Sequence, residues 1–88
     1  MYRLVLVCKG VPEDAGPNAA RGITEEFARR PWHQNVTCVW DGSTLMLQAD
    51  NDYDANGRAL IDEFSDTLCA CIKEPFDGDI DVVSVTRV

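Results

Sequence analysis

The sequence predicts an α+β fold in which a four-stranded antiparallel sheet carries two helices on one face. Three observations lead to this prediction. Apolar residues recur at helical spacing in two segments, residues 18–30 and 60–72. Asp41-Gly42 separates two segments of strand composition, which is typical of a β-hairpin with a type I′ turn. Apolar runs with strand character lie near both ends of the chain, at residues 4–8 and 80–88.

The first expected element is a strand over residues 3–8 with two apolar faces. Leu4, Leu6 and Cys8 alternate with Val5 and Val7, a pattern typical of a central strand that is covered on both sides. Two helices on one face of the sheet would cover only one of these sets. We therefore expect two copies of the chain to pair through the other set or through an edge strand. The loop of residues 9–17 is an alternative cover for this set.

The first helix is expected over residues 18–30. Asn18 would cap its N-terminus, and Pro31 would end it because proline disfavours helix in the residue before it. The hairpin strands follow, over residues 36–40 and 43–49.

The second helix is expected to begin at Ala55, with Asp54 as its N-cap. Its apolar stripe runs from Leu60 to Ile72. Residues 74–79 then break the chain before the last strand, residues 80–88.

This order of elements forms two split strand-helix-strand units, the ferredoxin-like βαββαβ plait, as a single domain over residues 1–88. In that topology the first and third strands are central. In length, element order and helix-under-sheet pattern, the whole chain resembles the small plait domains of the ACT-like kind. The resemblance implies a self-associating module that binds a small ligand at a subunit interface.

Charge and hydropathy narrow the choice of partners. The chain has 15 acidic and 8 basic residues, a net charge of -7, and all of this net charge lies in residues 50–88. Nucleic acid is not an expected partner because phosphate binding needs clustered basic residues, whereas a basic protein is compatible with the acidic half. Neither a membrane-spanning run nor a signal-peptide pattern is present in the sequence. We therefore expect no membrane association and a cytoplasmic location.

The four cysteines are expected to be free, mostly buried thiols. Their only close pair is the C-x-C of Cys69 and Cys71, whereas structural zinc sites use pairs spaced C-x2-4-C. Reduced thiols are also the rule in the cytoplasm.

Residues 52–63 carry the most specific local pattern in the chain. They match D-x-[DN]-x-[DN]-G-x5-E and resemble the EF-hand calcium loop. The resemblance implies a calcium ligand set made of Asp52, Asp54, Asn56, the Arg58 carbonyl and Glu63. The alternative is the N-cap role of Asp54 described above. The two are incompatible, because a helix from Ala55 would place Glu63 about two turns from Asp52.

These features favour a small non-enzymatic binding or regulatory module that self-associates as a homodimer through its sheet, with no cofactor expected. The interface candidates are Val5, Val7, Trp32 and Trp40. A calcium-binding protein that uses residues 52–63 is the first alternative. The second is a small enzyme with an intersubunit site, for which His33 would be the candidate base.

Overall fold

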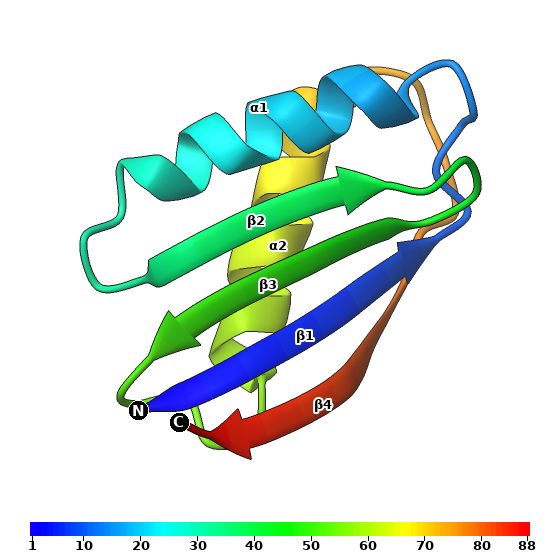
Figure 1. The fold of residues 1–88 in the computed structure, drawn as a ribbon. Helices are drawn as coiled ribbons and strands as arrows, with labels where there is room; N and C mark the ends of the chain where they lie inside the picture. The colour runs from blue at the N-terminus through cyan, green and yellow to red at the C-terminus, as the bar shows by residue number, and fades with distance from the viewer.

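The computed structural model describes residues 1–88 and confirms the predicted fold class. Its elements are, in order, β1 (Tyr2–Lys9), α1 (Gly16–Ala28), β2 (Gln34–Trp40), β3 (Leu45–Asn51), α2 (Arg58–Cys71) and β4 (Asp79–Arg87). The four strands form one antiparallel sheet in the order β2-β3-β1-β4, with both helices on the same side (Figure 1). This is the ferredoxin-like plait, and β1 and β3 are its central strands.

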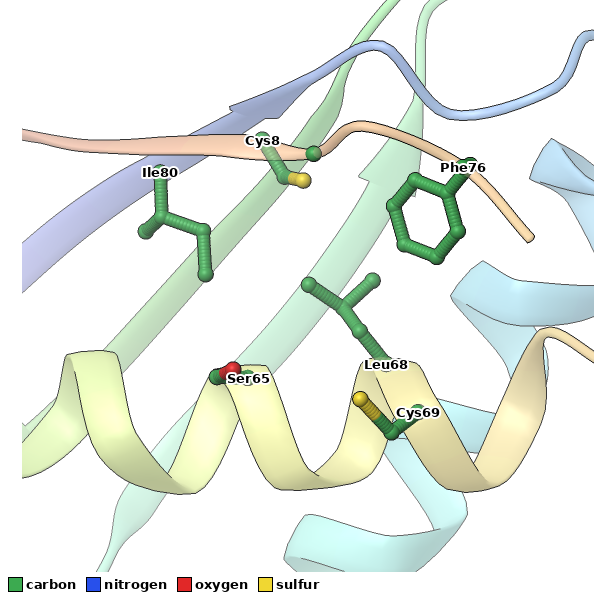
Figure 2. Close-up of a pocket in the computed structure, with 7 residues that line it drawn as sticks. Cys8, Ser65, Leu68, Cys69, Phe76 and Ile80 are labelled. Carbon is green, nitrogen blue, oxygen red and sulfur yellow. The ribbon is translucent and has the colours of Figure 1, made fainter.

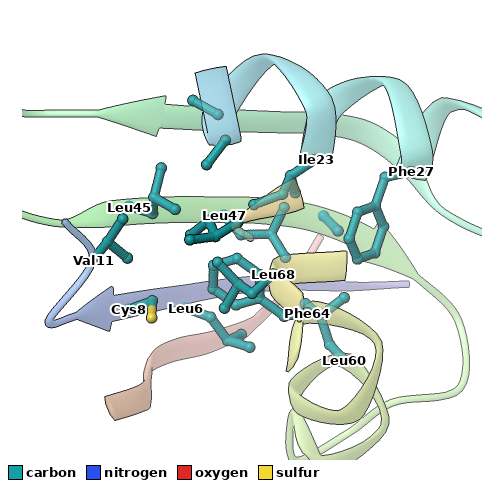
Figure 3. Close-up of a cluster of buried hydrophobic side chains, with 14 of the residues drawn as sticks. Leu6, Cys8, Val11, Ile23, Phe27, Leu45, Leu47, Leu60, Phe64 and Leu68 are labelled. Carbon is teal, nitrogen blue, oxygen red and sulfur yellow. The ribbon is translucent and has the colours of Figure 1, made fainter. Parts of the chain in front are cut away.

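The core lies between the sheet and the two helices. Leu4, Leu6 and Cys8 of β1 are fully buried there, and the helices close over them from one side (Figure 3). The other fully buried apolar side chains are Leu45, Leu47 and Ala49 of β3, Ala19, Ile23 and Phe27 of α1, and Leu60 and Phe64 of α2. Neither helix has the length and apolar content needed to cross a bilayer.

The two sets of side chains on β1 have different surroundings. Val5 and Val7 are only half-buried, whereas their neighbours Leu4 and Leu6 are 0% exposed. Successive side chains of a strand point to opposite faces of the sheet, and the helices cover one face only. The expectation that one face of β1 stays uncovered by the helices is therefore confirmed.

The start of α1 differs from the prediction. The helix begins at Gly16, so Asn18 lies inside it rather than at its N-cap. Pro17 fits the first turn of a helix because the N–H that it lacks has no partner there. Gly16 allows close packing on β2, since a Cβ at this position would lie 2.2 Å from the Trp40 ring.

The start of α2 also differs. The helix begins at Arg58, three residues later than predicted, because Gly57 has a φ of +82° and cannot continue a right-handed helix. Asp54 still caps the helix, but from outside its first turn. Its carboxylate accepts hydrogen bonds from the backbone N–H groups of Gly57 at 3.0 Å and Leu60 at 2.9 Å.

Candidate functional site

The uncovered face of the sheet carries an apolar patch made of Val5, Val7, Val39, Met46 and Val83, here called the open-face patch. Strand register places Val39 opposite Met46, and Met46 opposite Val7, so these three form a row across β2, β3 and β1. Val39 is 57% exposed and Met46 is 42% exposed. In Figure 1 α2 lies behind the sheet, α1 runs along the side of β2, and no element lies in front of the sheet. The row of Val39, Met46 and Val7 is therefore an apolar stretch on a face of the sheet that no helix covers.

A polar network borders the open-face patch along the same strands. Asp50 accepts two hydrogen bonds of 3.0 Å from the Arg3 guanidinium and one of 2.9 Å from the Asn35 amide. These groups leave Asp50 only 1% exposed although it is on the open face. The hydrogen bonds from Arg3 lower the pKa of the Asp50 carboxyl, and the same pairing raises the pKa of Arg3. The charges at this end of the patch therefore neutralise each other.

The edges of the sheet are less suited to association than its open face. The edge strand β4 contains a bulge in which Val83 is the extra residue, and the register of β2 shifts between Gln34 and Thr37. Bulges interrupt the row of free backbone groups that a further strand would need. β4 also exposes Asp79 and Asp81, and charges on an edge oppose pairing.

The structure separates the four residues predicted at an interface. Val5 and Val7 belong to the open-face patch. Trp40 is half-buried beside Gly16 of α1, on the helix side of the sheet. Trp32 lies between α1 and β2, is 50% exposed, and donates a 3.3 Å hydrogen bond from Nε1 to Glu63 Oε1.

The sequence prediction missed Val39, Met46 and Val83. The loop between β2 and β3 spans Asp41–Thr44, two residues longer than the Asp41-Gly42 turn that was expected, and Asp41 does not have the positive φ of a type I′ turn. A two-residue turn would pair Val39 with Thr44, so no local pattern predicted its pairing with Met46. No sequence pattern marks the bulge that exposes Val83.

The five residues of the predicted calcium loop do not meet at one point. Both carboxylate oxygens of Asp54 accept backbone hydrogen bonds, and Asn56 Oδ1 accepts one from Arg58 N at 3.0 Å. Asp52 is exposed, and Glu63 is directed toward His33. No three His, Cys, Asp or Glu side chains are grouped so that they could hold a metal ion. The geometry of this segment is that of a capped helix start.

A partly buried polar cluster surrounds Glu63, a second feature that the sequence prediction missed. His33 Nε2 lies 2.8 Å from Glu63 Oε2, and the Tyr53 hydroxyl donates to the same oxygen at 3.4 Å. Arg30 Nε lies 3.4 Å from Oε1, the oxygen that also accepts from Trp32. Desolvation, followed by the nearby Glu63 charge, raises the pKa of Tyr53 to about 12. Glu63 of α2 thus has four partners. Because Arg30, Trp32 and His33 all lie in the connection between α1 and β2, the cluster joins this connection to α2.

All four cysteines are free thiols, as expected. Only Cys8 is fully buried, Cys38 and Cys71 are half-buried, and Cys69 is exposed. Burial is the main cause that raises the pKa of Cys38 to about 12. This side chain therefore stays a neutral thiol at physiological pH.

Comparisons with known proteins identified no relative of this chain. No protein-family model, curated protein or solved structure matches the chain.

Proposed function

We propose that this protein is a small non-enzymatic binding or regulatory module that forms a homodimer by packing the open faces of two sheets against each other. The observation that supports this is the open-face patch, a row of exposed apolar side chains across three strands with nothing over it. Exposed apolar patches of this kind mark interaction surfaces. A two-fold dimer uses one and the same patch on both copies.

The size of the open face is close to what a dimer needs. Strands of seven to nine residues that lie about 4.8 Å apart and rise about 3.3 Å per residue give an outline of about 23 by 19 Å. A biological interface needs roughly 1,000 Å² in total, or about 500 Å² from each partner. The outline encloses roughly 440 Å² per copy, so the side chains at its border must supply the remainder.

Charge favours this face as the contact between two copies. Each copy has a net charge of -7, so most orientations bring like charges together. In register beside Val5 lie Gln48 and Ser84, which are uncharged, and Arg3 neutralises Asp50 at the border. Asp81, in register beside Val7, is the acid that lies against the patch. Apart from Asp81, the residues in register with Val5 and Val7 are uncharged, which limits the repulsion between two acidic copies at this face.

The free thiols support a cytoplasmic location for this dimer. None of the four cysteines is paired, and disulfides form in oxidising compartments rather than in the cytoplasm.

Sedimentation velocity over a range of protein concentrations tests the proposal. We expect a dimer with a dissociation constant on the order of micromolar. Val39→Glu should weaken it at least about tenfold, because it buries an unpaired charge at the interface. Ala70→Glu is the matched control, since it adds the same charge on the exposed side of α2 and should leave the dimer unchanged. A wild-type protein that remains a monomer at millimolar concentration would contradict the proposal.

A further inference from the structure

A pocket of about 200 Å³ opens on the helix side of the sheet, between α2 and the strands β1 and β4. It exists because α2 crosses the sheet steeply and leaves the beginning of β4 without a helix over it (Figure 1). Cys8 and Ile80 line the strand side, Leu68 and Phe76 line the interior, and Ser65 and Cys69 lie along α2 at the opening (Figure 2).

We propose that this pocket binds a small neutral molecule with a single aromatic ring. The volume is appropriate, since an apolar cavity of about 150 Å³ lined by Leu, Ile and Phe is known to hold benzene. Five of the seven lining residues here are hydrophobic. Leu68, Phe76 and Ile80 supply the same types of side chain, in a space slightly larger than one ring.

The lining also suits a ring that bears one hydroxyl group. Phe76 offers an aromatic partner for edge or offset contact. Burial raises the pKa of the Cys8 thiol, so the strand side of the pocket is uncharged. Ser65 places a hydroxyl at the opening, where it can hydrogen-bond to a polar substituent that stays near water. Phenol combines these properties.

The charges around the pocket disfavour anions. Asp66 follows Ser65 on α2, and Asp77 precedes Gly78 of the lining. Both are exposed, and no basic residue lines the pocket. A carboxylate on the ring would be repelled by these acids, so phenol should bind in preference to benzoate.

This site is independent of the proposed dimer. Cys8 and Leu68 face the helix side of the sheet, whereas the open-face patch lies on the other side. The pocket can therefore fill whether or not two copies associate.

Titration of ¹⁵N-labelled protein with phenol, followed by amide chemical shifts, tests the inference. We expect saturable shifts confined to residues around the pocket, with a dissociation constant of about a millimolar, as is usual for a ligand of this size. Benzoate, which has the same ring and a negative charge, should bind at least about fivefold more weakly.

Two variants block the opening from α2. Cys69→Trp and Ser65→Trp each place a large ring at the edge of the pocket, and both positions are exposed, so the fold should tolerate them. Either variant should lose at least about tenfold in phenol affinity through steric exclusion. Ala70→Trp, at an exposed position outside the lining, should bind as the wild type does.

The inference is overturned if phenol shifts the wild-type amides without saturation, or if the shifts are scattered over the whole chain. Equal binding by both blocked variants and the wild type would overturn it as well. Benzoate binding as strong as that of phenol would contradict the assignment of a neutral ligand.

Discussion

Arg3 on β1 and Asp50 on β3 form a two-pronged ion pair across the open face of the sheet, with Nε and Nη2 of Arg3 each 3.0 Å from an Asp50 oxygen. The pair joins the two central strands beside the apolar patch. A buried carboxylate is stable only where its oxygens are hydrogen-bonded, and Asn35 supplies the third donor. The pair therefore combines stabilisation of the sheet with neutral charge at the border of the proposed interface.

Asp50→Asn should destabilise the protein at neutral pH by about 1–3 kcal/mol, because it removes the charge from buried hydrogen bonds. The pKa of Asp50 is lower in the folded than in the unfolded chain. Its contribution is thus fully present above the unfolded-state pKa, about 4, and is lost as pH falls through the folded-state pKa. Urea unfolding of both proteins should show a difference that shrinks toward acidic pH.

The control for this prediction is Asp52→Asn. Asp52 is exposed, so its replacement should change the free energy of unfolding by no more than about 0.5 kcal/mol. A gap between wild type and Asp50→Asn that stays constant from neutral to strongly acidic pH would contradict the role of the ionised carboxylate.

Asp54→Ala should destabilise the protein by about 1–2 kcal/mol, since it leaves the N–H groups of Gly57 and Leu60 without their shared acceptor. Gly57→Ala should cost a similar amount or more. Its φ is +82°, and the new Cβ would lie 2.8 Å from Val82 Cγ2. Urea unfolding measures both. Asn56→Ala loses only one exposed hydrogen bond, to the backbone N–H of Arg58, and is the control. An equal loss of unfolding free energy in all three variants would contradict the capping geometry.

The tautomer of His33 follows from the orientation of Asn51. Asn51 Oδ1 accepts from the backbone N–H groups of Tyr53 and Asp54, so its amide nitrogen faces His33 Nδ1 at 3.4 Å. Nδ1 must then act as the acceptor, and the neutral ring carries its hydrogen on Nε2, facing Glu63. Long-range ¹H–¹⁵N correlation spectra of the imidazole should show this tautomer.

Loss of the Glu63 carboxylate should destabilise the protein. Glu63→Ala leaves the buried His33 ring without a partner at Nε2, which should cost about 1–3 kcal/mol. Asp62→Ala is the control at the neighbouring exposed position. Equal unfolding free energies for the two variants would show that the cluster contributes nothing specific.

Calcium gives a direct test of the resemblance of residues 52–63 to an EF-hand loop. Because both oxygens of Asp54 already accept backbone hydrogen bonds, we expect no change in the melting temperature at millimolar calcium. A ligand that binds only the folded state must raise it. A calcium-dependent rise that Glu63→Gln abolishes would favour the calcium-binding alternative instead.

The order of elements could be predicted because each depends on local patterns. Alternation in β1, the Asp41-Gly42 turn and the stripe from Leu60 each specify an element without reference to distant residues. The start of α2 could not be predicted in this way, because it depends on a left-handed Gly57 packed against Val82 of β4. Such a contact has no signal in the segment itself.

Part of the candidate site was predictable for the same reason. One face of β1 is expected to stay uncovered, because the strand has two alternating sets of apolar side chains and the helices cover only one of them. The cluster around Glu63 was hidden, because His33 and Glu63 are 30 residues apart and meet only through the packing of α2. The calcium-loop pattern arises in an acidic helix start, where Asp and Asn are favoured as caps.

The most direct test of the proposed homodimer is an isotope-filtered NOE experiment on a mixture of labelled and unlabelled protein. We expect intermolecular contacts between the methyl groups of Val5, Val7, Val39 and Met46, all on the open face. A protein that shows no intermolecular contact at millimolar concentration, or contacts only along β2 and β4 as edge strands, would contradict face-to-face association.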